Sequence, residues 1–230
     1  MNPPLTLMVL LLLLLGHTSH AADDAPGTWL ILSTTDRFGA ADAPGPWRYA
    51  LDAQYRWFDR SGGVDQVLLR PALGYDLTPT LSAWLGYAQV RSEGSGGTHV
   101  KEHRVWQQLA WQFDGAANSR WLLRGRVEER HREGADGTGV TLRLMLRSRI
   151  PLGKRPDLRL VLALEPFIDL RDTDWGLNQG LAQLRTTLGL SFDLHRRLGF
   201  EAGYLNQHAF RENRTDLANH LLYLHFQARF

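Results

Sequence analysis

The chain of 230 residues contains no cysteine. It can therefore form neither a disulfide framework nor a thiolate metal site, and it offers no cysteine for attachment of a lipid. Histidine, another metal ligand, occurs nine times, but these residues are dispersed, and His220 and His225 fall on opposite faces of one expected strand. We expect no metal centre and no cofactor.

A strong charge of one sign is also lacking. The sequence has 26 Lys and Arg against 24 Asp and Glu, which gives a formal net charge of +2. The small basic excess is spread along the chain and forms no basic tail, so the composition argues against a nucleic-acid partner.

The usual catalytic signatures are absent from the sequence. It contains no Gly-x-Ser-x-Gly elbow, no His-Glu-x-x-His and no phosphate-binding glycine loop. Glu128 and Glu129 are adjacent, so on a strand they face opposite ways and cannot work as a paired acid and base. These absences favour a protein that is not an enzyme.

Long apolar runs are confined to Leu5–Leu15. About eleven apolar residues are too few to span a bilayer as a helix and match the core of a signal peptide, although no Lys or Arg precedes the run. Ser19-His20-Ala21 is a suitable cleavage site, so we predict a signal peptide over residues 1–21. A buried N-terminal helix is the alternative. After residue 22 no run of 18 apolar residues occurs, which excludes helical membrane spans.

Charged residues recur at every second position of the segment Arg120–Arg130. The charged positions are Arg124, Arg126, Glu128 and Arg130, and Leu123, Gly125 and Val127 alternate with them. On a helix these charges would surround the axis, whereas on a strand they occupy one face. Alternation with charges on one face and apolar residues on the other is typical of a transmembrane β-barrel, apolar toward lipid and polar toward the lumen.

Segments of about ten to thirteen residues recur along the chain, separated by turn residues. They are residues 47–59, 64–76, 80–91, 102–114, 119–131, 138–150, 158–169, 179–193, 197–210 and 217–230. This length suits a tilted strand that crosses a bilayer, and compact connections alternate with longer ones, as in outer-membrane barrels. We predict an all-β, antiparallel transmembrane β-barrel over residues 47–230, in the outer membrane of a Gram-negative bacterium.

The segment 28–38 complicates the number of strands. It could be a strand, but it would be the eleventh, and bacterial single-chain barrels have even strand counts. We therefore assign no structure to residues 22–46 and predict about ten strands, with twelve as the alternative.

Aromatic residues gather on the apolar faces near the ends of strands that meet at short turns. This predicted aromatic girdle, of the kind found at membrane interfaces, comprises Trp47, Tyr49, Tyr75, Trp111, Phe113, Trp121, Phe192 and Phe200. The last strand carries Phe226 and ends on Phe230. A terminal aromatic residue of this kind resembles the signal that outer-membrane barrels present to their insertion machinery. Membrane lipid and that machinery are the expected partners.

The polar faces predict a row of charges of alternating sign across neighbouring strands. With turns centred at Ala116, between Ala135 and Asp136, and at Lys154, directly opposed residues form the row Arg104–Glu128–Arg143–Glu165. The same register places Glu102 opposite Arg130, and Arg126 and Arg185 face the same lumen. The row either fills a narrow interior or forms an arginine-rich constriction for anions.

Several short motifs together resemble the domain-of-unknown-function family numbered 2490. They are Arg70-Pro71-Ala72-Leu73-Gly74-Tyr75, Leu85-Gly86-Tyr87, Glu102-x-Arg104, Gln107-Gln108-Leu109, Arg126-x-Glu128-x-Arg130 and Gly203-Tyr204-Leu205. The resemblance covers about residues 28–230. It implies an exported outer-membrane barrel and implies no activity.

Three function classes fit these observations. We favour a non-enzymatic structural or envelope protein with a narrow lumen filled by charges. The alternatives are a narrow porin-like channel for small anionic solutes and an outer-membrane enzyme that acts on lipid. Such an enzyme needs Ser or His at the outward edge near a loop, and only His208 meets that requirement.

We predict that deletion of Phe230 lowers the folded, membrane-inserted fraction, because the last strand then lacks its terminal aromatic residue. The measurement is the share of protein extracted from membranes with the mobility of a folded barrel. Assembly equal to that of the full chain would show that the terminal residue is dispensable.

Overall fold

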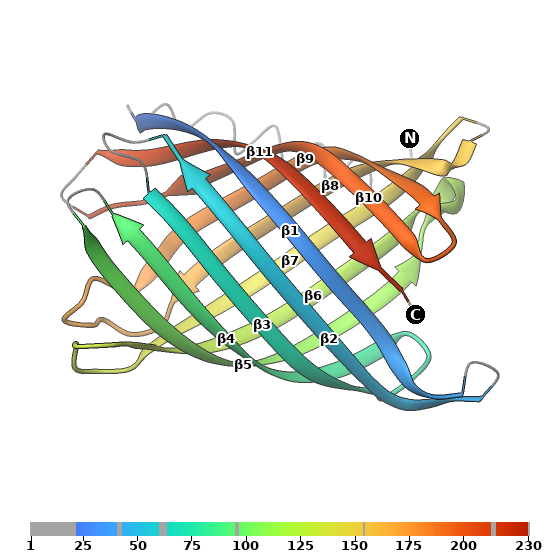
Figure 1. Cartoon of the computed structure of the whole chain (residues 1–230), viewed down its shortest axis with the longest axis horizontal. Helices are drawn as coiled ribbons and strands as arrows, with labels where there is room; N and C mark the ends of the chain where they lie inside the picture. Colours follow the sequence, from blue (N-terminus) through green and yellow to red (C-terminus); the bar gives the residue numbers. More distant parts are fainter. Residues whose placement is uncertain are drawn as a thin grey trace.

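The computed structural model describes residues 22–40, 43–59, 64–94, 97–153, 155–212 and 215–229. The expected signal peptide and Phe230 lie outside these residues. Within them the chain forms one closed β-barrel of eleven tilted strands (Figure 1). The first six strands are β1 (Ala22–Ala40), β2 (Ala43–Phe58), β3 (Val64–Asp76), β4 (Leu81–Gly94), β5 (Thr98–Asp114) and β6 (Arg120–Arg132). The others are β7 (Gly139–Leu152), β8 (Arg155–Asp169), β9 (Gly180–His195), β10 (Leu198–Ala209) and β11 (Asp216–Ala228).

The predicted all-β barrel is confirmed, and each of the ten predicted segments overlaps one of the strands β2 to β11. The only helical turn in the described ranges is η1 (Ala116–Asn118), between β5 and β6. None of the described residues belongs to a helix that is long and apolar enough to cross a membrane.

The predicted strand number was wrong, because the segment 28–38 belongs to β1. β1 pairs in parallel with β11, from Ala22 opposite Asp216 to Thr34 opposite Ala228. Every other neighbouring pair is antiparallel, since each connection reverses the chain. With eleven strands the first and the last therefore run in the same direction. Parallel pairing is only slightly less stable per residue than antiparallel pairing, so an odd count is physically permitted.

Side chains alternate between the lumen and the outside of the barrel as the sequence predicted. In β6, Arg126 and Glu128 face the lumen and are 4% and 2% exposed, whereas Val127 between them is 39% exposed. Leu73 and Leu85 on the outer face are more than half exposed. The charged interior and apolar exterior are the reverse of what a water-soluble sheet protein shows.

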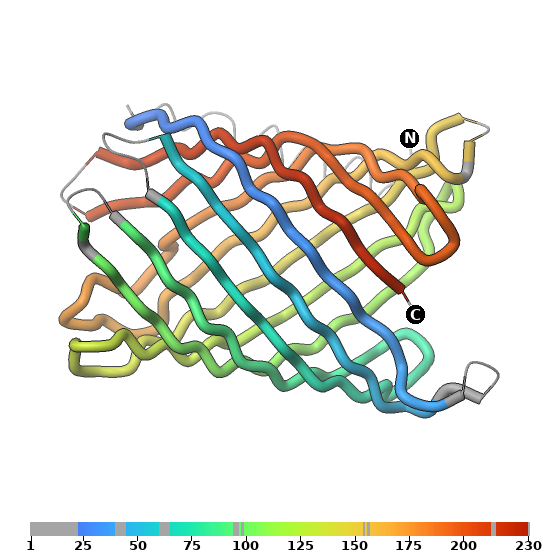
Figure 2. The backbone as a smooth tube through the Cα atoms, in the orientation of Figure 1, coloured from blue at the N-terminus to red at the C-terminus, as the bar shows by residue number. Residues whose placement is uncertain are grey.

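The two ends of the barrel differ. We call the end with the connections 77–80, 115–119 and 196–197 the turn end, and the opposite end, with the connections 133–138 and 170–179, the loop end. Figure 2 shows these connections, with β1 beginning at the loop end and β11 finishing at the turn end.

The predicted aromatic girdle lies on the outer face near the turn end. Ring centroids are 5.1 Å apart for Trp47 and Tyr75 and 6.4 Å apart for Phe192 and Phe200. Trp111 and Phe113 are in contact at 4.7 Å. Trp121 differs from the others, because it is 4% exposed and its indole N–H donates to the Ser119 hydroxyl at 2.9 Å. Tyr49 completes the set through its contact with Phe38.

We predict that Gly27→Ala destabilises the barrel where β1 closes it. A Cβ at Gly27 would lie 2.3 Å from the Trp57 carbonyl oxygen and 2.8 Å from the Leu221 side chain. Gly125→Ala is the matched control, because its Cβ would meet no atom closer than 3.8 Å. The temperature at which the folded band is lost on a gel should fall for Gly27→Ala alone. Equal melting of the two variants would show that β1 is not an obligatory strand.

Candidate functional site

Glu128 is the centre of the most buried charge cluster in the lumen. Its carboxylate accepts hydrogen bonds from Arg143 at 2.6 Å and from Arg126 at 3.3 Å, and Arg104 lies 3.6 Å away. Three guanidinium groups therefore surround one carboxylate. These groups come from β5, β6 and β7, because each strand directs its alternate, charged side chains into the lumen at neighbouring levels.

Two further carboxylates extend the cluster. Glu165 accepts from Arg143 at 2.7 Å and from Arg124, and Arg185 lies 4.0 Å from it. Towards the loop end, Glu102 accepts from Arg104 at 2.8 Å and from Arg130 at 2.5 Å. We call this cluster the lumen ion network. Its members are Glu102, Arg104, Arg124, Arg126, Glu128, Arg130, Arg143, Glu165 and Arg185.

All eight charged residues predicted to share the lumen are members of this network, but the predicted register was wrong by two residues. Arg104 is opposite Arg130, Glu128 is opposite Thr141, and Arg143 is opposite Phe167. The contacts Arg104–Glu128, Glu128–Arg143 and Arg143–Glu165 all exist, as diagonal pairs. Diagonal neighbours on one face lie about 7–8 Å apart, which an arginine side chain spans.

The turns explain the shift. The β5–β6 pairing is centred on Ala117 instead of Ala116, because the connection runs over residues 115–119. It includes η1, which has positive φ at Ala117 and Asn118. The β7–β8 ladder is irregular between Pro151 and Leu152. A change of one residue in a turn centre moves the pairing by two residues, which keeps every side chain on its face and changes only its partner.

Aromatic rings support the arginines of the lumen, and sequence reasoning missed them. The guanidinium of Arg126 lies 4.0 Å from the centre of the Trp106 ring, and Arg56 lies 3.8 Å from that of Trp29. Arg143 stacks on Phe167 at 4.3 Å. A signal was present, because Trp106 and Phe167 each fall two residues from an inward-facing charge. Such stacking stabilises a desolvated guanidinium without a second carboxylate.

Arg56 is a buried lumen arginine whose hydrogen-bond acceptors are not carboxylates. It is 7% exposed, and its hydrogen bonds go to neutral amides, at 2.7 Å to Gln66 and at 2.5 Å to Gln54. The network itself holds six arginines and three glutamates. The interior is therefore electropositive overall.

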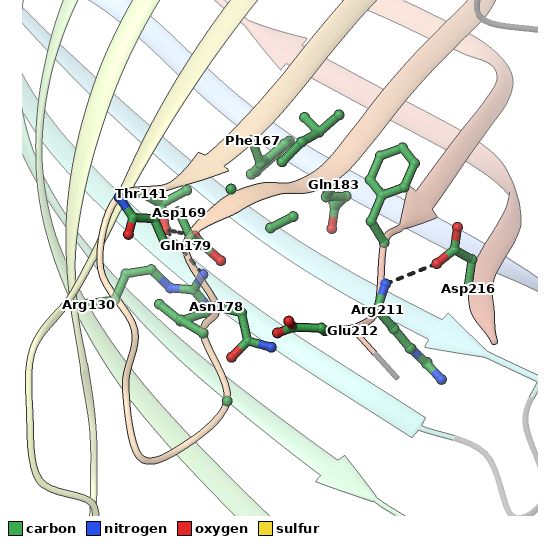
Figure 3. Close-up of a pocket in the computed structure, with 16 residues that line it drawn as sticks. Arg130, Thr141, Phe167, Asp169, Asn178, Gln179, Gln183, Arg211, Glu212 and Asp216 are labelled. Atoms are coloured by element: carbon green, nitrogen blue, oxygen red, sulfur yellow. Dashed lines mark hydrogen bonds between the residues drawn. The ribbon is translucent and has the colours of Figure 1, made fainter. Parts of the chain in front are cut away.

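A cavity of about 480 Å³ opens above the network at the loop end. Figure 3 shows Arg130, Asp169 and Gln183 among the side chains that line it. Thr141 donates to the Asp169 carboxylate at 2.6 Å. The lining combines charges of both signs with amide groups, which suits a water-filled entrance.

A smaller inner cavity of about 190 Å³ lies on the other side of the network. Trp84, Trp106, Arg70 and Asp52 are among its lining residues, and Arg70 bonds to Asp52 at 3.1 Å. The lumen ion network thus separates two hollow regions of the barrel.

The outer face carries histidines near the loop end. His208 bonds to Asp216 at 3.0 Å, and His220 links the hydroxyl of Tyr204 to Asp24.

In the lumen, Ser33 and His225 are 2.7 Å apart, a serine–histidine contact that sequence reasoning missed. The described part of the chain has no group of three potential metal ligands. The expectation that the chain is not an enzyme stays a prediction.

Comparison with known proteins connects this barrel to a family. The family model described as "Protein of unknown function (DUF2490)" matches residues 26–218. This chain belongs to that family. An uncharacterised protein of Methylorubrum extorquens is 31% identical over 185 residues, which cover 79% of this chain and 80% of the relative. No solved structure matches. The family resemblance expected from the sequence is confirmed, and the match begins inside β1.

We predict that Glu128→Gln lowers stability by about 3–5 kcal/mol, because breaking a buried ion pair leaves the remaining charges uncompensated. Here the uncompensated groups are the guanidiniums of Arg143, Arg126 and Arg104. Thermal loss of the folded gel band measures the effect.

The matched control is Asp157→Asn, whose partner Arg155 is 3.3 Å away in an exposed pair. Exposed pairs of this kind contribute about 0–1 kcal/mol. Equal melting of the two variants would mean that Glu128 does not neutralise the arginines around it.

Proposed function

We propose that this chain is an outer-membrane β-barrel that serves as a non-enzymatic structural protein of the envelope, with a lumen closed by the lumen ion network. The observation that carries the proposal is the burial of Glu128, Arg126 and Arg143, which are 2%, 4% and 5% exposed in the middle of the barrel. An open pore would leave such side chains in contact with water.

The outer surface supports the membrane location. Large apolar side chains are exposed on most strands, among them Leu109 at 53% and Leu222 at 54%. Monomeric soluble proteins rarely expose contiguous apolar surface on this scale. The barrel also closes on itself, so it presents no unpaired sheet edge to lipid over the β1–β11 ladder. The expected signal peptide and the girdle at the turn end agree with this location.

The dimensions of the barrel support a closed lumen. The bore of a barrel of about this strand number barely exceeds the side chains that fill it. Here arginines and their stacked aromatic rings fill it, and the described carboxylates of the network each have at least two arginine partners. A solute could pass only by breaking several of these ion pairs together.

The excess of arginine supports a narrow channel for small anions as the second candidate. Arg56 has neutral hydrogen-bond acceptors, so an anion that entered the lumen would find a desolvated positive group. A channel requires the network to open, and electrical measurement separates the two candidates.

We predict that the protein fractionates with the outer membrane, migrates differently on a gel before and after boiling, and conducts no current in planar bilayers. The first two results follow from a folded barrel in lipid, and the third follows from the closed lumen. Glu128→Gln, which removes the central carboxylate, tests closure. The variant should conduct no better than the unaltered protein if the network only fills the lumen, and anion conductance should rise if the network is a gate.

Recovery in the soluble periplasm with no mobility shift would overturn the membrane location. Steady anion-selective conductance of the unaltered protein would instead establish the channel and overturn the closed lumen.

A further inference from the structure

Asp169 differs from the other buried carboxylates of the described residues, because it has no cation. It is 3% exposed and accepts a hydrogen bond from the Thr141 hydroxyl at 2.6 Å, but no described Lys, Arg or His forms an ion pair with it. The other four buried carboxylates each contact at least two arginines, and they are Glu102, Glu128, Glu165 and Glu201. A buried carboxylate without a cation is costly, so Asp169 calls for an explanation.

The arginine beside Asp169 is directed to another carboxylate. Two nitrogens of Arg130 donate to Glu102, at 2.5 Å and 3.2 Å, and the third lies 3.4 Å from the Thr141 hydroxyl. Thr141 in turn donates to one oxygen of Asp169. The other oxygen of Asp169 receives no hydrogen bond from the described residues, and Asp169 lines the loop-end cavity of about 480 Å³. A ligand in that cavity could therefore reach this carboxylate.

The wall of the loop-end cavity is fixed by contacts of the two long connections. Leu177, in the connection after β8, is 8% exposed and packs over Gly139, where a Cβ would be 2.3 Å from the leucine side chain. The Asp174 carboxylate accepts from the backbone N–H of Asp136, in the connection before β7, at 3.2 Å. The cavity is therefore formed before a ligand arrives, and the mouths of β-barrels commonly hold small ligands.

The entrance of this cavity is acidic. The connections 133–138 and 170–179 hold four acidic residues and one basic residue, Arg171. Asp172 and Asp174 accept hydrogen bonds from backbone N–H groups, which leaves their charges without a cation. The lumen ion network beneath the cavity is electropositive. A cation is therefore attracted to the entrance and repelled by the lumen below it, so both fields favour a cation at the level of Asp169.

We propose that the loop-end cavity binds a linear aliphatic polyamine such as spermidine. One terminal ammonium group lies against Asp169 and supplies the cation that this carboxylate lacks. The methylene chain crosses the cavity along Phe167, Leu177 and Phe210, which line it. A second ammonium group reaches Glu212, which Figure 3 shows entering the cavity from the connection after β10.

Charge and hydrogen-bonding capacity together select this ligand. An ammonium group has three N–H donors, and beside Asp169 the side-chain amides of Asn178 and Gln179 offer further acceptor oxygens. A metal ion would need several oxygen ligands at once, and the described residues contain no group of three potential metal ligands. A neutral molecule would leave Asp169 uncompensated. The inference goes beyond the proposed envelope role and requires neither the membrane location nor the closed lumen.

The test is isothermal titration of the folded, detergent-solubilised barrel with spermidine at physiological salt. Salt screens the exposed charges of the connections more than it screens a buried carboxylate, so binding at the entrance alone is suppressed. The unaltered barrel should show saturable binding at a single site. Heptanediol, a neutral chain of similar length, should not displace spermidine, and neither should Mg²⁺ at an equal concentration of charge.

Asp169→Asn keeps an oxygen that can accept from Thr141 and removes the charge. It should weaken spermidine binding about tenfold or more, the usual worth of a hydrogen bond to a charged group. Glu212 is exposed, so Glu212→Gln should weaken binding by about two- to fivefold, as expected for an exposed ion pair. Asp157→Asn, at the turn end, is the matched control and should bind as the unaltered barrel does.

Absence of saturable binding by the unaltered barrel would overturn the proposal. Equal binding by a folded Asp169→Asn barrel would show that the buried carboxylate is not the site, and an unchanged Glu212→Gln barrel would overturn the placement of the chain across the cavity. Displacement by heptanediol would show binding by the apolar lining alone, and displacement by Mg²⁺ would show counter-ion binding at the entrance alone. Either result would overturn the assignment, and both competitions decide even where Asp169→Asn does not fold.

Discussion

The structure depends on the mutual neutralisation of charges in a space too narrow for water to solvate them. Glu128 is the clearest case, because three arginines converge on a carboxylate that is 2% exposed. Burial makes each charge costly by itself, and each becomes tolerable only when its partners are in place. The strands around the lumen must therefore keep their levels relative to one another, and the network acts as a constraint on register as well as a filling.

The same constraint explains what could be predicted from the sequence. Alternation in β6 places Arg124, Arg126 and Glu128 on one face whatever their partners are, so the barrel and the inward set of charges follow from local pattern. Partners depend on turn geometry, and η1 has positive φ at Ala117 and Asn118. Asparagine adopts this conformation readily but alanine rarely does, so the sequence does not indicate where the turn is centred. The resulting shift by two residues preserved the faces and the ion pairs, because arginine is long enough to bridge the diagonal.

The features that could not be predicted are those that depend on distant parts of the chain. β1 closes the barrel through a parallel ladder with β11, about 190 residues away, and no local pattern specifies a partner at that separation. The inward aromatic rings are a second example. The position of Trp106, two residues from Arg104, places it on the inward face of its strand, but the arginines that stack on Trp29 and Trp106 belong to neighbouring strands, Arg56 to β2 and Arg126 to β6. The rings then stabilise the arginines for which the network has too few carboxylates.

With the closed lumen that we propose, the wall and the cavity at the loop end are the surfaces on which the protein meets other molecules. In most of the described wall the backbone ladder is continuous and side chains cover both sides. Around Pro71 the ladder lacks a backbone donor, and the Trp106 ring covers Gly86 from the lumen while its indole N–H has no acceptor among the described residues. Each departure costs stability, and each would be removed by an ordinary strand residue or by a polar partner. The contact of the Trp106 ring with Ala72 and Ala88 offsets part of that cost, because it buries apolar surface against the wall where the ladder lacks a bond.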